Sequence, residues 1–194
     1  MYAKRPREGI RRWTTAGLVL SAGIFVAACS SPAATPESSA PSGTPAQLVN
    51  AGLAALHAGN DQTARQDFNQ VLAEDPSNKT GVNQIAYFDL GVLDAAQGQR
   101  AASEAEYNLA LNVDPNYYLA QYNLAVEEAV ANPQGAIALY RKVVASQPKD
   151  VAAIYNLGLL LYQQRQVSEG QVYLAKALAL DPSYQKYLPA GVTP

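Results

Sequence analysis

The sequence offers few side chains whose type and spacing would support catalysis. His57 is the only histidine and Cys29 the only cysteine in 194 residues. An activated nucleophile needs a base within hydrogen-bonding reach, and a metal site needs several clustered ligands. Neither set can be assembled from single copies of these two residues, and His57 is best interpreted as a surface residue near a helix end.

Acidic residues are the remaining candidates for acid–base chemistry. Two pairs stand close together in the sequence: Glu104 with Glu106, and Glu127 with Glu128. On a helix, residues one or two positions apart do not face each other, so a solvated helix face explains both pairs better. We therefore predict that the protein is not an enzyme and binds no metal and no cofactor.

Charge is distributed unevenly along the chain. The first dozen residues carry five cations: Lys4, Arg5, Arg7, Arg11 and Arg12. From residue 29 onward, 9 Lys and Arg stand against 15 Asp and Glu, a formal net charge of −6. Because phosphate binding requires clustered Lys and Arg, this acidic body argues against nucleic acid as a partner.

Cys29 follows an uncharged, mostly apolar run from Trp13 to Ala28. These 16 residues are short for a membrane span, which takes about 20. They suit the apolar region of a secretory signal peptide. Residues 29–45 are rich in Ser and Pro and contain no large apolar side chain, so we expect a disordered tether there.

The sequence Val26-Ala27-Ala28-Cys29 resembles the lipobox of bacterial lipoproteins. The resemblance implies that residues 1–28 are a signal peptide and that the Cys29 thiol carries a lipid. A thiolate is a good nucleophile for such a transfer. The alternative is an N-terminal signal anchor that is never cut.

The elements that follow repeat at a regular interval. Pro76, Pro115, Pro148 and Pro182 each close a segment, at spacings of 39, 33 and 34 residues. Within each segment, apolar residues recur every three or four positions, which predicts two amphipathic helices. A period near 34 with two helices resembles the tetratricopeptide repeat.

The resemblance extends to the packing positions. The second helix of each segment opens on a small residue and places a bulky one four positions later: Phe68, Tyr107, Tyr140 and Leu174. It implies an all-α fold, a right-handed superhelical α-solenoid of about four repeats, within residues 46–183. The predicted repeats are 46–78, 84–116, 117–149 and 151–184, with a C-terminal capping turn and tail at 184–194.

Two irregularities carry predictions of their own. Ser77 to Asn83 holds about five extra residues, which predicts a looser junction or a longer helix. In the third segment Asn132-Pro133 replaces the glycines of the earlier turns, Gly59 and Gly98. Because Asn tolerates the left-handed conformation and Pro suits the first position of a helix, we expect a tighter turn here and an unbroken repeat.

In tetratricopeptide proteins the first helices line a concave groove that takes a peptide. The resemblance implies that the groove here is lined by Val49, Asn50, Leu53, Phe88, Val92, Tyr122, Asn123, Val126, Tyr155, Asn156, Leu159 and Tyr162. The alternative is that these side chains are buried inside the superhelix. Where relatives of this family hold a carboxylate with Lys or Arg, this chain has no cation: the positions carry Val49, Leu53, Asp89, Leu119 and Asn123.

Together these features predict an exported adaptor of the bacterial cell envelope. The expected partner is a protein or peptide in a Tyr-rich groove, with the membrane reached through the lipid on Cys29. The expected location is the outer face of the cytoplasmic membrane, the periplasm or the outer membrane. A self-associating structural module is the alternative.

Overall fold

The structure is a computed structural model that describes residues 43–192 and 194. The predicted signal peptide, Cys29 and most of the tether lie outside the described residues. The described part contains eight α-helices and a final 3-10 helix: α1 (Pro45–His57), α2 (Asp61–Glu74), α3 (Asn83–Ala96), α4 (Arg100–Val113), α5 (Tyr118–Glu128), α6 (Pro133–Ser146), α7 (Val151–Gln163), α8 (Val167–Leu180) and η1 (Pro182–Tyr187).

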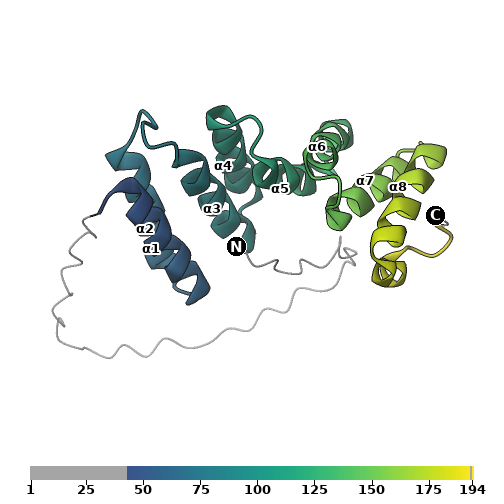
Figure 1. The fold of residues 1–194 in the computed structure, drawn as a ribbon, viewed down its shortest axis with the longest axis horizontal. Coiled ribbons are helices and arrows are strands. Elements are labelled where there is room, and N and C mark those ends of the chain that lie inside the picture. The colour runs from purple at the N-terminus through teal and green to yellow at the C-terminus, as the bar shows by residue number, and fades with distance from the viewer. Residues whose placement is uncertain (1–42, 193) are drawn as a thin grey trace, which may run out of the picture. The chain divides into compact units, whose positions relative to one another are not determined.

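The helices pack as four consecutive pairs. α1 packs against α2, α3 against α4, α5 against α6 and α7 against α8, and each second helix also contacts the first helix of the next pair. Figure 1 shows the pairs following one another in chain order. The predicted all-α solenoid is confirmed, because the helices pack against their partner in the pair and against the neighbouring pair.

In each pair a bulky side chain of the second helix packs where the two helices come closest. Phe68, Tyr107, Tyr140 and Leu174 are all essentially buried. In three pairs the facing residue on the first helix is a glycine. A Cβ on Gly91 would lie 2.6 Å from the Tyr107 ring, and one on Gly158 would lie 2.9 Å from the backbone nitrogen of Leu174. The close approach of the two helices therefore requires a small residue at Gly91 and Gly158.

Gly158→Ala is expected to lower the free energy of unfolding by about 2–3 kcal/mol, because backbone, unlike a flexible side chain, cannot yield to the new methyl group. Gly98→Ala, at a left-handed turn with open space around it, is the comparison and should cost about 1 kcal/mol. Urea unfolding followed by circular dichroism measures both. Equal losses would contradict a close approach at Gly158.

The turns inside the pairs use different chemistry. Gly59 and Gly98 have φ of 77° and 74°, in the left-handed region, and Arg165 takes the same conformation in the fourth pair with φ 64°. In the third pair Pro133 stands at the first helical position, as the sequence predicts, while Asn132 has φ −138° and caps α6 by accepting a hydrogen bond from the Gly135 N–H. Pro133 then starts the helix, so this turn needs no left-handed residue.

The five extra residues after α2 form neither a looser junction nor a longer helix. The Asp75 carboxylate accepts hydrogen bonds from the backbone N–H groups of Lys79 and Thr80, at 2.8 and 2.7 Å, and from the Thr80 hydroxyl. Those bonds, led by the two from Thr80, lower the pKa of Asp75. Asn83 Nδ2 donates to the Asp75 carbonyl at 2.7 Å. The insertion is thus tied to the start of α3.

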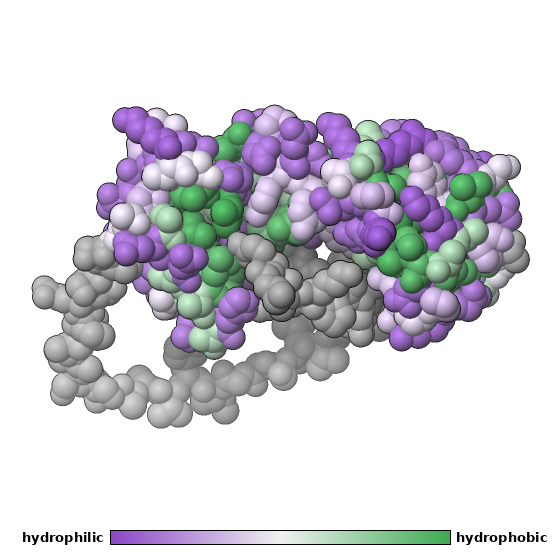
Figure 2. All heavy atoms as spheres, in the orientation of Figure 1, coloured by the Kyte–Doolittle hydropathy of each residue, from purple (hydrophilic) through white to green (hydrophobic). Residues whose placement is uncertain are grey.

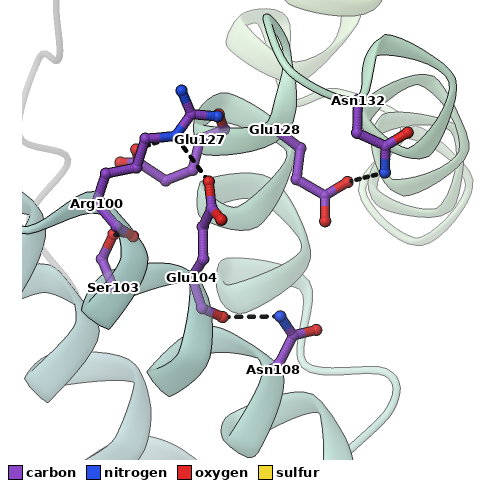
Figure 3. A network of polar contacts seen from close by, with 7 residues as sticks. All are labelled: Arg100, Ser103, Glu104, Asn108, Glu127, Glu128 and Asn132. Carbon is purple, nitrogen blue, oxygen red and sulfur yellow. Dashed lines mark hydrogen bonds and ion pairs between the residues drawn. The ribbon is translucent and has the colours of Figure 1, made fainter.

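Three of the four acidic residues singled out from the sequence accept hydrogen bonds in and around α4 and α5. Arg100 of α4 donates to Glu104 at 2.7 Å and to the backbone carbonyl of Glu127 on α5, and Asn132 donates to Glu128 (Figure 3). Arg65 of α2 donates to Asp94 of α3 at 2.6 Å in the same way. The Arg100–Glu104 pair is partly exposed, and exposed ion pairs contribute about 0–1 kcal/mol each.

Candidate functional site

The predicted groove residues lie on the first helix of each pair, α1, α3, α5 and α7. The structure divides them by exposure. Asn50 and Val126 are exposed; Leu53, Phe88, Val92, Tyr122 and Tyr162 are half-buried; Val49, Asn123, Tyr155, Asn156 and Leu159 are buried. The exposed and half-buried residues of the first three pairs, mostly apolar or aromatic, are called the first-helix surface below.

Two aromatic rings on this surface are held by rings from the second helices and, for Phe88, also by the residue that precedes α5. Phe88 lies 5.9 Å from Tyr107 and 5.5 Å from Tyr117, measured between ring centroids, and the second contact is edge-on. Tyr122 lies edge-on to Tyr140 at 5.7 Å. Edge-on aromatic pairs contribute about 0.5–1.5 kcal/mol beyond their burial. Phe88 and Tyr122 are therefore held in place before any partner arrives.

One of the predicted groove asparagines, Asn156, bonds to the neighbouring pair of helices. Asn156 Nδ2 donates to the Tyr122 hydroxyl at 3.0 Å and lies 3.4 Å from the Tyr140 hydroxyl. Burial is the main reason that the pKa of Tyr140 is raised, with Tyr122 adding to the effect. Asn156 thus joins two repeats and is not a free donor for a ligand backbone; Asn50 is the asparagine that stays exposed.

The last first helix is covered by the end of the same chain. The Tyr184 ring of η1 packs on Tyr155 at 5.1 Å, and the Tyr162 hydroxyl donates to the Gly191 carbonyl at 3.2 Å. Tyr155 is only 2% exposed, and burial, followed by Tyr184, raises its pKa to about 12. The structure therefore places Tyr155, Asn156 and Leu159 in the core, and Tyr184 covers Tyr155.

Asp89 was named in the sequence only as a position that carries no cation, and it was not among the predicted groove residues. It stands on α3 beside Phe88 and is 7% exposed. Burial alone raises the pKa of Asp89 to about 7, with no hydrogen bond or cation contributing. The signal in the sequence was its position: Asp89 occupies the place that Asn50, Asn123 and Asn156 take in the other pairs.

The chemistry of this surface is apolar and aromatic contact with a few polar tips. Across residues 43–192 no three His, Cys, Asp or Glu side chains come together as metal ligands would. None of the helices in this described range is long and apolar enough to cross a bilayer. His57 is exposed at the end of α1. The arrangement suits binding a protein segment.

Apolar side chains are also exposed elsewhere on the described surface. Val130, after α5, and Val172, on α8, are the most exposed of the large ones. Figure 2 shows apolar areas separated by polar surface on the face in view. Scattered apolar residues are normal on a protein surface, so Val172 is a suitable reference position outside the first-helix surface.

Comparison with known proteins agrees with the helix pairs. Family models described as tetratricopeptide repeat match residues 48–78 and 129–188. Tetratricopeptide repeat protein 6 of Homo sapiens is 25% identical over 130 residues, which is 67% of this chain and 24% of the human protein. The chain thus spans about a quarter of that relative. The tetratricopeptide repeats inferred from the period near 34 are confirmed.

Solved structures share the fold. MamA from Desulfovibrio magneticus RS-1 aligns with a TM-score of 0.63 at 24% identity, covering 75% of this chain and 80% of that one. PilW, described as a widely conserved type IV pilus biogenesis factor, aligns with a TM-score of 0.61 at 17% identity, covering 72% and 63%. At these identities the likeness concerns the fold alone.

Proposed function

We propose that this chain of tetratricopeptide repeats is a lipid-anchored scaffold of the cell envelope that binds a protein partner on its first-helix surface. The partner contributes an extended or helical segment that lies across α1, α3 and α5. The tether of residues 29–45 separates this surface from the membrane. The lipid on Cys29 keeps the scaffold at the outer face of the cytoplasmic membrane, in the periplasm or at the outer membrane.

The observation that carries this proposal is the preformed aromatic row. Phe88 and Tyr122 are half-buried and braced from behind, while Val92 and Val126 flank them with partly exposed apolar side chains. Half-buried aromatic side chains with a polar tip are enriched at interfaces, because they supply contact area at low entropic cost. A purely structural packing role would not require the row to reach the surface.

Val126→Asp is expected to abolish partner binding while leaving the fold intact. Val126 is 38% exposed, so the carboxylate stays solvated in the free protein. In the complex it would be buried against an apolar partner, which costs several kcal/mol. Affinity purification of the tagged full chain from its native membranes, with quantitative mass spectrometry, measures the loss.

Val172→Asp is the matched control, because it places the same charge at an exposed valine on a second helix. An unchanged set of co-purified proteins for Val126→Asp would contradict the proposed surface. Sedimentation of both variants identifies the self-associating alternative. In that case the wild type forms a concentration-dependent dimer that Val126→Asp dissociates, and no other protein depends on Val126.

A further inference from the structure

We infer that Asp89 is a subsite for a cation, and that the segment bound on the first-helix surface inserts a Lys or Arg side chain between the first and second repeats. The inference rests on the proposed function and specifies the chemistry of its ligand. Its basis is a comparison of one position across the repeats of the same chain.

The position immediately before the Leu-equivalent residue of each first helix carries a polar residue: Asn50, Asp89, Asn123 and Asn156. In the fourth repeat Asn156 reaches two hydroxyls of the third, those of Tyr122 and Tyr140, at 3.0 and 3.4 Å. Tyr122 comes from the preceding first helix and Tyr140 from the preceding second helix. A polar group buried at this position is thus satisfied from the repeat before it.

Asp89 occupies this position in the second repeat, but the residues that should satisfy it are apolar. The counterparts of Tyr122 and Tyr140 in the first repeat are Val49 and Phe68, and neither side chain can donate a hydrogen bond. Among the described residues no hydrogen bond or ion pair is formed by the Asp89 side chain, although the residue is more than nine-tenths buried. An ionised carboxylate in such surroundings is costly unless a cation joins it.

The surroundings favour a cation over any other ligand. Residues 45–113, which form the first two repeats, hold three Lys and Arg against eight Asp and Glu, a formal charge of −5. Residues 114–180, which form the last two repeats, hold five of each and are neutral. Arg65, the one Lys or Arg of residues 45–78, is paired with Asp94 at 2.6 Å, and no cation contributes to the pKa of Asp89. A cation from outside would meet the more acidic pair of repeats and, at Asp89, a nearly buried carboxylate that no cation of the described residues pairs.

A random dodecapeptide library displayed on phage, panned against the detergent-solubilised full chain, tests this inference. The expected result is that the enriched peptides share apolar residues and carry Lys or Arg at one fixed position. Panning on Asp89→Asn should keep the apolar preference and lose the Lys or Arg. Asp67→Asn is the matched control, because Asp67 is also buried but lies on the second helix α2; it should keep both preferences.

One enriched peptide then isolates the contact in a double-mutant cycle. Replacing its Arg by citrulline, which keeps the shape and removes the charge, should weaken binding to the wild type at least roughly tenfold, as expected for a desolvated charge pair. The same replacement should change binding to Asp89→Asn by less than about twofold. Enriched peptides without a cation preference, or with one that survives in Asp89→Asn, would overturn the cation subsite alone. Enrichment of no peptide on the wild type would overturn the peptide-binding function together with it.

Discussion

Asp89→Asn is expected to raise the free energy of unfolding by about 2–4 kcal/mol at pH 8 and to leave it almost unchanged at pH 4. The reference pKa of the aspartate is 3.8, and burial raises it to about 7 in the folded chain. Each unit of difference corresponds to about 1.4 kcal/mol. Asparagine fits the position, since Asn123 and Asn156 occupy it in the third and fourth repeats.

Proton linkage determines that the wild type becomes less stable as the pH rises. Between about pH 4 and pH 7 the folded chain holds a proton on Asp89 that the unfolded chain has released, so the wild type loses stability as the pH rises through this window. Above pH 7 the loss is complete, and below pH 4 it is absent. The asparagine variant has no such group, so the difference between the two proteins should grow through the same window.

Urea unfolding at pH 4, 6 and 8 measures this difference. Glu74→Gln is the control, because Glu74 is an exposed carboxyl on α2 and its replacement should give a small, pH-independent change. A variant that is no more stable than the wild type at pH 8 would mean that the carboxylate is already satisfied in the folded chain. The cation subsite would then lose its physical basis.

Cys29→Ser is expected to abolish lipid labelling and release the protein from membranes. The hydroxyl of serine is a far weaker nucleophile than a thiolate at neutral pH, so no acyl chain would be attached. Two acyl signals are needed for stable membrane anchoring, and the loss of both should move the folded repeats to the soluble fraction. Metabolic labelling with a palmitate analogue, followed by fractionation, measures both effects.

Ser30→Ala is the control for this experiment, because it changes the next residue and leaves the thiol in place. Labelling that persists in Cys29→Ser would contradict lipidation at this residue. If labelling is absent from the wild type and the intact N-terminus stays in the membrane, the uncut signal anchor is the correct alternative. Mass spectrometry of the N-terminal peptide distinguishes these outcomes.

The fold was predictable because each repeat carries the same residue types at the same spacing. The prolines mark the ends of the pairs, and Gly91 facing Tyr107 is a small–large match that recurs at a fixed spacing. Local turn chemistry was less predictable. Asn132 is equally suited to a left-handed turn and to a helix cap, and only the position of the Gly135 N–H decides between them.

The candidate site depended on contacts that the repeat pattern does not encode. The pattern treats the four first helices alike, so it predicted a groove along all of them. The fourth is covered by Tyr184, which lies beyond the last repeat, where no period specifies the path of the chain. The repeat spacing gives the position of Asp89 within its helix. It does not give the contacts made there, such as the bonds from Asn156 to Tyr122 and Tyr140 that Asp89 lacks.

Site-specific photocrosslinking in the native cells tests the proposed function most directly. A photoreactive amino acid at Val126, on the first-helix surface, should crosslink the full chain to one protein partner. The same amino acid at Val172, which is 66% exposed on α8, should give no such product. Crosslinking from Val126 should also disappear in the Asn50→Arg variant, which places a bulky charge on the first-helix surface. Crosslinks of equal yield from both valines, or from Val172 alone, would contradict a binding surface on the first helices.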